Sequence, residues 1–200
     1  MSSLSIRLAR PADAGDILSI YAPAVRGSSI SFEWEPPTAE QMRDRVGSIL
    51  NGGHPWLVCS EGPRCVGFAY SQQHRARAAY RWSAEVSVYV HADYVRRGIG
   101  RALYTSLFAI LELMGFQNAY AGATLPNPAS VGLHTALGFR EIGVYRQVGF
   151  KHGAWHDVIW WARDLGTHPA VPPLPLTLVE AQSSGDWPRA LATGVPFLKP

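Results

Sequence analysis

The sequence predicts a mixed α/β fold, with one domain over residues 1–166 and a tail over residues 167–200. Segments with the two-residue period of strands alternate with segments whose apolar residues recur every three or four positions, as in helices. The clearest strand pattern, Trp82 to Val90, runs directly into a glycine turn and an apolar-striped helix. Hydrophobic residues make up 47% of the 200 residues, which is enough for one sizeable core.

The first half of the domain is expected to hold a strand, two helices and a hairpin. A proline and an acid in residues 10–13 favour a helix start, and Gly52 with Gly53 ends the second helix. The turn at Glu61-Gly62-Pro63 joins two β-rich runs. In order, these elements are expected at residues 5–9 (strand), 10–21 (helix), 36–50 (helix), and 56–60 and 65–70 (hairpin strands).

The second half is expected to complete the sheet around two further helices. Alternation places Trp82, Val86 and Val90 on one face of a strand, and Gly115 ends the helix that follows. Asn127-Pro128 has the pattern of an N-cap followed by a first-turn proline. The elements are expected at residues 82–90 (strand), 103–114 (helix), 120–123 (strand), 128–137 (helix), and 141–148 and 155–162 (strands).

The composition changes after Gly166, where prolines, serines and a glycine become frequent. Such a segment has few apolar residues to bury, so we expect residues 167–200 to be extended or disordered. The chain has two cysteines, no signal peptide pattern and no apolar run long enough for a membrane span. These features predict free thiols, a cytoplasmic location and no membrane association.

A glycine turn between a strand and a helix is the first candidate site. Gly98 and Gly100 flank Ile99, and arginines stand at positions 96, 97 and 101. Glycines let the backbone approach a ligand closely, and the N-terminus of the following helix favours an anion. The turn therefore predicts a pyrophosphate site, although a glycine turn without a ligand is the commoner case. A formal charge of +3, without a dense basic tract, fits such a local anion site better than nucleic acid.

Two titratable residues stand near this turn in the predicted fold. Glu85 lies in the middle of the strand that leads into it, where partial burial would raise a carboxyl pKa and suit a general base. A solvated position on a half-exposed sheet face is about equally compatible with the alternation. His134 shares a helical face with Val131 and Leu137, and a histidine in that setting is more often a core residue than a catalyst.

Other chemistries have weaker signals. Arg75, Arg77 and Tyr80 precede the Glu85 strand and could bind a carboxylate or phosphinate, or could form a solvated loop. The histidines and cysteines lack the spacing of metal ligands, so no metal is expected. A serine nucleophile elbow and a P-loop lysine are absent from the sequence, which excludes the hydrolase and nucleotide-triphosphatase classes that use them.

The assembled order of elements resembles the GNAT superfamily of acetyl-CoA-dependent N-acetyltransferases, and within it the phosphinothricin acetyltransferases. The resemblance covers residues 6–165. It is carried by six segments: Pro55–Val58, Ala76–Glu85, Val88–Val90, Leu125–Asn127, Leu133–Phe139 and Gly149–Val158. It implies a strongly bent mixed sheet with helices on both faces, in which two parallel strands splay apart to hold acetyl-CoA.

Carried over by position, the resemblance implies a set of cofactor contacts. Val88, Tyr89 and Val90 would bond the pantetheine through backbone groups, and Asn127 would lie near the thioester. The pyrophosphate would be bound by the turn at Arg96, Arg97, Gly98, Ile99, Gly100 and Arg101.

The resemblance also implies catalytic and acceptor-binding residues. Glu85 would take a proton from the substrate ammonium, and His134 would protonate the departing thiolate, where many members of the superfamily have tyrosine. Arg77, Tyr80 and Phe32 match positions associated with the acceptor, and Arg75 is a weaker candidate. A homodimer is implied, because the family builds its substrate pocket near a subunit interface.

This sequence departs from the family pattern at Val95, where a polar residue usually begins the glycine turn, and at Thr124, where glycine is common beside the acceptor pocket. The larger Thr124 could change which acceptor fits. The expected reaction is acetylation of the α-amine of phosphinothricin, methionine sulfoximine or methionine sulfone in a ternary complex. The alternatives are an N-acetyltransferase for a different small amine and a non-catalytic acyl-CoA-binding module.

Overall fold

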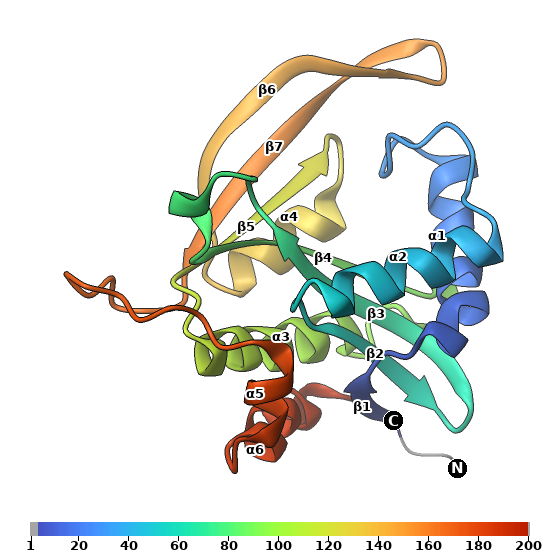
Figure 1. Ribbon diagram of the computed structural model, residues 1–200. Helices are drawn as coiled ribbons and strands as arrows, with labels where there is room; N and C mark the ends of the chain where they lie inside the picture. The colour runs from blue at the N-terminus through green and yellow to red at the C-terminus, as the bar shows by residue number, and fades with distance from the viewer. Residues whose placement is uncertain (1–3, 200) are drawn as a thin grey trace.

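A computed structural model describes residues 4–199 as one mixed sheet covered by helices on both faces (Figure 1). Seven strands lie in the order β1-β2-β3-β4-β5-β7-β6. Their bounds are β1 Leu4–Leu8, β2 Trp56–Glu61, β3 Arg64–Gln73, β4 Ser83–Val90, β5 Asn118–Thr124, β6 Arg140–Lys151 and β7 Ala154–Asp164. The predicted mixed α/β class is confirmed, and every predicted strand is present.

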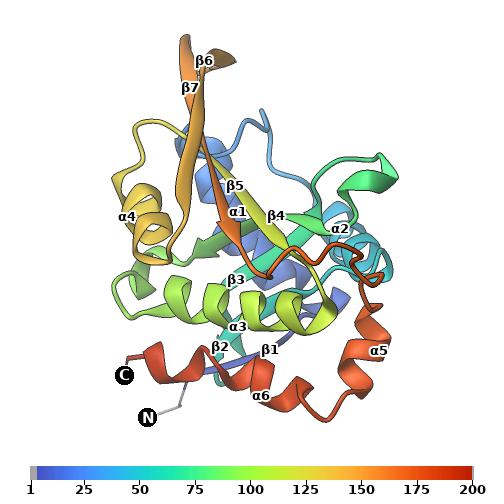
Figure 2. The same cartoon turned by 90° about the vertical axis from the view of Figure 1, so that its left-hand side faces the viewer.

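The helices divide between the two faces of the sheet. Helices α1 (Ala14–Gly27) and α2 (Ala39–Asn51) cover one face, where Val25, Val46 and Trp56 are fully buried in one core cluster. Helix α3 (Ile99–Met114) covers the other face, and α4 (Pro128–Ala136) packs beside β7. Figure 2 shows α3 running beneath the sheet, with α6 on its outer side.

Helix α3 is fixed at both ends by glycine. Gly98 (φ 77°) is the N-cap and Gly115 (φ 90°) follows the last turn, and both φ values are in the left-handed region that favours glycine. Between them one side of the helix is almost continuously apolar and buried, as the helical period predicts. The helix therefore begins at the end of the glycine turn and presents its N-terminus beside β4.

The C-terminal segment differs from the sequence prediction. Residues 166–177 are extended, but α5 (Leu178–Ser183) and α6 (Trp187–Ala192) follow, and a 3₁₀ turn spans Val195–Phe197. The expectation of an extended or disordered tail is wrong for these residues, because Leu178, Ala181 and Ala190 are buried in the core cluster of α3. Thr177 and Glu180 form a capping box at the start of α5, a sequence signal that was overlooked.

Cys59 and Cys65 are both free and buried, as predicted for thiols rather than a disulfide. Burial raises the pKa of each to about 12, which keeps the two side chains as inert thiols. Among residues 4–199, no helix combines the length and the apolar character that crossing a bilayer requires.

Candidate active site

The candidate site begins where two neighbouring strands part. Strands β4 and β5 are the parallel pair of this sheet, and their pairing extends from Ser83–Asn118 to Glu85–Tyr120. Beyond that point β4 remains paired with β3 as far as Val90, while its other edge no longer has β5 as a partner. Residues 86–90 therefore present backbone N–H and C=O groups that an extended ligand can bond like an added strand.

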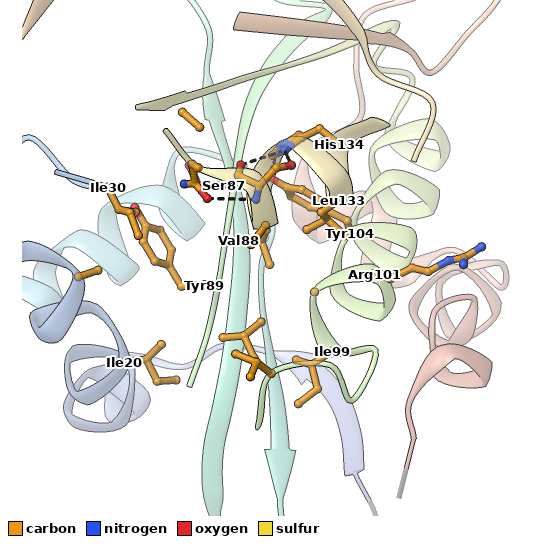
Figure 3. A pocket seen from close by; sticks show the side chains of 18 of the residues that line it. Ile20, Ile30, Ser87, Val88, Tyr89, Ile99, Arg101, Tyr104, Leu133 and His134 are labelled. Carbon is orange, nitrogen blue, oxygen red and sulfur yellow. Dashed lines mark hydrogen bonds between the residues drawn. The ribbon is translucent and has the colours of Figure 1, made fainter. Parts of the chain in front are cut away.

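A cavity of about 550 Å³ occupies this opening; we call it the groove. Its walls are the splayed part of β4, the glycine turn, the start of α3, and α4. In Figure 3, Val88 lies on the strand at the centre, with Ile99 below and His134 with Leu133 on the helix above it. The residues predicted to bind a cofactor that line the groove are Val88, Tyr89, Val90, Arg96, Gly98, Ile99, Gly100, Arg101 and Asn127.

The backbone of the turn is shaped by left-handed residues. Arg96 (φ 65°) and Gly98 (φ 77°) both have positive φ, which turns the chain sharply into α3. A Cβ on Gly100 would lie 3.3 Å from Leu133 Cδ2, so glycine here allows α4 to approach. The first N–H groups of a helix have no partners within the helix, and those of α3 lie beside the groove. This arrangement can bind a phosphate or pyrophosphate group.

The three arginines of the turn have different surroundings. The Arg97 guanidinium is 3.3 Å from Glu61 Oε1 and lies over the Tyr94 ring, and Arg97 is not among the groove-lining residues. The Arg101 guanidinium lies 4.2 Å from the ring centroid of Phe197 and points away from Val88 in Figure 3. Within residues 4–199, Arg96 has no carboxylate within salt-bridge distance. Arg96 is thus the turn arginine with a guanidinium available to an anion.

Helix α4 supplies two polar side chains to the groove. Asn127 caps the helix, because its Oδ1 accepts a hydrogen bond of 3.1 Å from the Ser130 N–H. The Asn127 amide nitrogen remains as a donor that could reach a ligand. The cap also fixes the direction of the helix, and hence the position of His134 two turns later.

His134 is buried, with 4% of its surface exposed, and its ring stacks on Trp161 at a centroid distance of 4.6 Å. Its Nδ1 lies 2.8 Å from the Ser130 carbonyl oxygen and 3.2 Å from Ser130 Oγ, and the nearer carbonyl, which can only accept, favours a proton on Nδ1. Its Nε2 faces the Tyr104 hydroxyl at 3.4 Å. Burial lowers the pKa of His134 and raises the pKa of Tyr104, so both side chains are neutral near pH 7.

A second cavity of about 320 Å³ adjoins the groove; we call it the acceptor cavity. Ile30, Gly122 and Ala123 line both cavities, so the two meet where β4 and β5 separate. Most of its other walls are apolar, and its carboxylate is that of Glu85. A molecule in this cavity would therefore meet a ligand of the groove beside a carboxylate.

Glu85 is half-buried, with 23% of its side chain exposed. Burial raises its pKa, and a hydrogen bond from Gln72 Nε2 (3.3 Å) acts in the opposite direction. His74 Nδ1 lies 3.7 Å from Glu85 Oε2, and this nitrogen is buried without a hydrogen-bond partner. The solvated alternative for Glu85 does not describe this setting, which is that of a carboxylate with an elevated pKa facing a cavity.

The predicted acceptor-binding residues fall into two groups. Phe32 and Thr124 line the acceptor cavity, and Thr124 is buried. Arg75, Arg77 and Tyr80 lie on the exposed segment between β3 and β4 and outside the lining of both cavities. The structure thus brings two of the five predicted residues to the acceptor cavity.

The loop that carries Phe32 is held by a lysine that the sequence analysis overlooked. Lys151 is 1% exposed, and its ammonium donates to the carbonyl oxygens of Val25 (2.6 Å), Ser28 (2.9 Å) and Ser31 (2.7 Å). Phe32 in turn rests on Gly149, where any Cβ would overlap the ring. Strand β6 therefore fixes one wall of the acceptor cavity from two positions.

Two further residues of the site were also missed. Tyr104 is buried against His134, and His74 stacks on Tyr120 at 4.3 Å beside Glu85. Tyr104 falls within the apolar stripe of a helix and His74 in a polar loop, so no local signal sets them apart. Among residues 4–199, no group of three or more histidine, cysteine or acidic side chains could hold a metal ion.

Comparison with known proteins connects this geometry to one family. Residues 6–160 match the acetyltransferase (GNAT) domain. The chain is 39% identical to a phosphinothricin N-acetyltransferase of Streptomyces viridochromogenes, over 86% of this chain and 93% of the relative. It is 30% identical to an L-methionine sulfoximine/L-methionine sulfone acetyltransferase of Salmonella typhimurium, over 84% of this chain and 98% of the relative.

A solved structure with the same fold carries a ligand. The crystal structure of a GNAT superfamily phosphinothricin acetyltransferase from Sinorhizobium meliloti in complex with acetyl-CoA superimposes with a TM-score of 0.81 at 34% identity. The match covers 86% of this chain and 94% of that one.

The contacts of Lys151 predict a large loss of stability when its charge is removed. Lys151→Met is expected to lower the free energy of unfolding by about 3 kcal/mol, because three carbonyls lose a charged donor. Urea unfolding would measure the change. Arg140→Met is the matched control, since this exposed cation pairs with Asp164 and should cost about 0.5 kcal/mol. Equal losses of stability in the two variants would contradict the stabilising role assigned to Lys151.

Proposed function

The chain belongs to the GNAT family of acetyltransferases, and from this premise we propose that it acetylates the α-amine of phosphinothricin or a related amino acid, such as methionine sulfoximine or methionine sulfone. The observation that carries this proposal is the junction of the two cavities beside Glu85. An acyl donor in the groove and an amine in the acceptor cavity would meet there, next to a base.

The groove fits acetyl-CoA, the co-substrate of the GNAT family. We propose that the backbone of Val88, Tyr89 and Val90 bonds the pantetheine along the free edge of β4. The N-terminus of α3 and Arg96 would bind the pyrophosphate, and Asn127 would donate near the thioester end. Arg97 and Arg101 contribute less to this proposal than the sequence predicts, because Glu61 and Phe197 hold their guanidinium groups.

The proposed reaction is a direct transfer. Glu85 accepts a proton from the substrate ammonium, since only the neutral amine has a free lone pair. The amine nitrogen attacks the thioester carbonyl carbon, and the C–S bond then breaks. The nitrogen loses a second proton as the amide forms, and one proton ends on the CoA sulfur. No covalent enzyme intermediate is required.

His134 is the proposed proton donor to the sulfur, with a constraint that its tautomer imposes. In its neutral form its proton lies on Nδ1 and is bonded to the Ser130 carbonyl. It can donate from Nε2 only as the imidazolium. Because burial lowers the pKa of His134, this form is scarce at neutral pH, but it is a stronger acid than an exposed imidazolium. We therefore assign His134 a smaller contribution to the rate than Glu85.

The acceptor cavity supports an amino acid with a compact, partly apolar side chain. Phe32, Val148 and Trp160 surround it, and Thr124 adds a hydroxyl and a methyl group. The proposed partners of the acceptor's acidic groups are Arg75, Arg77 and Tyr80. These exposed residues would have to close over the cavity or act from a second subunit.

A homodimer is proposed from the surface of the β6–β7 hairpin, which projects from the body of the molecule (Figure 1). Strand β6 is a sheet edge, and five apolar side chains of the hairpin are exposed: Ile142, Tyr145, Val148, Phe150 and Trp155. An apolar edge of this kind is typical of a protein interface. Tyr145 and Val148 also line the acceptor cavity, so a second copy bound here would help to enclose the acceptor.

An acceptor screen tests the proposed substrate class. Release of CoA thiol is expected with phosphinothricin, methionine sulfoximine and methionine sulfone, and not with polyamines. Turnover restricted to another small amine would change the proposed substrate but keep the proposed acetyltransferase activity. Binding of acetyl-CoA without turnover on any amine would favour the alternative of an acyl-CoA-binding module.

The role of Glu85 predicts a specific pH dependence. Glu85→Gln is expected to lower kcat/KM about 100-fold or more at pH 7, with partial recovery at high pH, where the amine deprotonates unaided. In the wild type, activity should fall as the pH drops through the pKa of Glu85. Because this pKa is raised, the acidic limb should lie above the usual range of a glutamate.

Glu112→Gln is the matched control for this measurement. Partial desolvation also raises the pKa of Glu112, an exposed residue of α3 outside the lining of both cavities. Its pH–rate profile should equal that of the wild type. A wild-type profile for Glu85→Gln would remove Glu85 as the base.

The dimer proposal predicts that Trp155→Glu lowers the sedimentation coefficient from that of a dimer to that of a monomer. Trp155 is 60% exposed, and a glutamate in its place would bring an unpaired, desolvated charge into the interface. Val171→Glu is the control, because Val171 is 87% exposed on the extended C-terminal segment. A wild-type protein that sediments as a monomer at all concentrations would refute the proposal.

A further inference from the structure

The last residues of the described chain contact the turn at the start of α3. The Lys199 N–H donates to the Arg97 carbonyl oxygen at 3.0 Å, which joins the two segments by a backbone hydrogen bond. The Phe197 carbonyl lies so close to Gly98 that any Cβ at position 98 would overlap it. Position 98 thus needs glycine for two reasons, the positive φ of its backbone and the close contact with the Phe197 carbonyl.

Side chains reinforce the same contact. The Phe197 ring lies under the Arg101 guanidinium at 4.2 Å, and this cation–π pair directs the end of the Arg101 side chain toward the C-terminal segment. The pair ties the first turn of α3 to the C-terminal segment. Arg97, on the other side, is tied to Glu61. The turn is therefore held at Arg97, Gly98 and Arg101, while Arg96 is left facing the groove.

The C-terminal segment is itself firmly attached to α3. Ser106 Oγ donates to the Leu191 carbonyl (2.7 Å) and accepts from the Gly194 N–H (3.1 Å). Gly194 packs on the Ala102 carbonyl so closely that a Cβ would overlap it. Together with the buried Leu178 and Ala190, these contacts give the 3₁₀ turn at Val195–Phe197 a fixed position. The segment that makes these contacts, residues 178–199, lies beyond the matched domain, which ends at residue 160.

We propose that residues 178–199 are a positioning element for acetyl-CoA binding, in which Phe197 holds the pyrophosphate-binding turn in its binding conformation. A turn with two left-handed residues, Arg96 and Gly98, has accessible alternatives when it is unsupported. An element that removes those alternatives lowers the cost of ordering the turn when the ligand binds. This inference rests on the proposal that the groove binds acetyl-CoA. It assigns the segment a role in acetyl-CoA binding and none in amine binding or acetyl transfer.

The test compares the KM for acetyl-CoA with the KM for the amine in Phe197→Ala. The KM for acetyl-CoA should rise about threefold to fivefold, the range that a lost cation–π contact implies, with kcat and the KM for the amine unchanged. Phe197→Tyr keeps the ring and should restore the wild-type KM. Phe197→Leu keeps apolar volume without the ring and should resemble Phe197→Ala, so that a defect in packing alone is recognised.

Val179→Ala is the matched control, because Val179 is a 72% exposed apolar residue of α5 that should have no effect on either constant. The Kd of CoA, measured by calorimetry without any amine, should rise in parallel with the KM in Phe197→Ala. Equal CoA affinity of Phe197→Ala and the wild type would overturn the inference, as would an equal rise in the KM for the amine. A wild-type protein that does not bind CoA would instead refute the proposed function.

Discussion

The separation of β4 from β5 after the Glu85–Tyr120 pair is the constraint on which the site depends. Up to this pair the two strands form an ordinary parallel ladder, and beyond it β4 has a free edge facing the groove. The unpaired groups of that edge are costly if they are buried without partners, so they favour a ligand with an extended amide-bearing chain. Because Glu85 stands at the branch point, the same separation places a carboxylate in the lining of the acceptor cavity, which shares Ile30, Gly122 and Ala123 with the groove.

Desolvation has opposite effects on the two titratable residues of the site. It raises the pKa of Glu85 and lowers the pKa of His134, because in each case burial disfavours the charged form. For Glu85 the result is a stronger base than a solvated glutamate. For His134 the result is a neutral ring whose orientation is set by Ser130, Tyr104 and Trp161. Burial thus favours the proton-accepting role proposed for Glu85 and limits the proton-donating role proposed for His134.

Periodicity and turn chemistry predicted the sheet, the four helices of the main domain and the location of the groove, since local patterns determine these features. The partners of Arg97 and Arg101 were beyond such reasoning, because Glu61 and Phe197 are distant in sequence from the turn. His74 and Lys151 were missed for the same reason, as their partners come from other elements. Helix α5 was different, because its Thr177–Glu180 capping box is a local signal that the sequence analysis overlooked among the surrounding prolines.

The apolar lining of the acceptor cavity has a consequence for the basicity of its occupant. An ammonium group that enters between Phe32, Val148 and Trp160 loses most of its hydration, and Glu85 is its ionisable neighbour in that lining. The α-ammonium of an amino acid is more acidic than the ammonium of a lysine side chain. Under the proposed function, the cavity would therefore discriminate among amines by the cost of neutralising them as well as by shape, and it would favour the less basic ones.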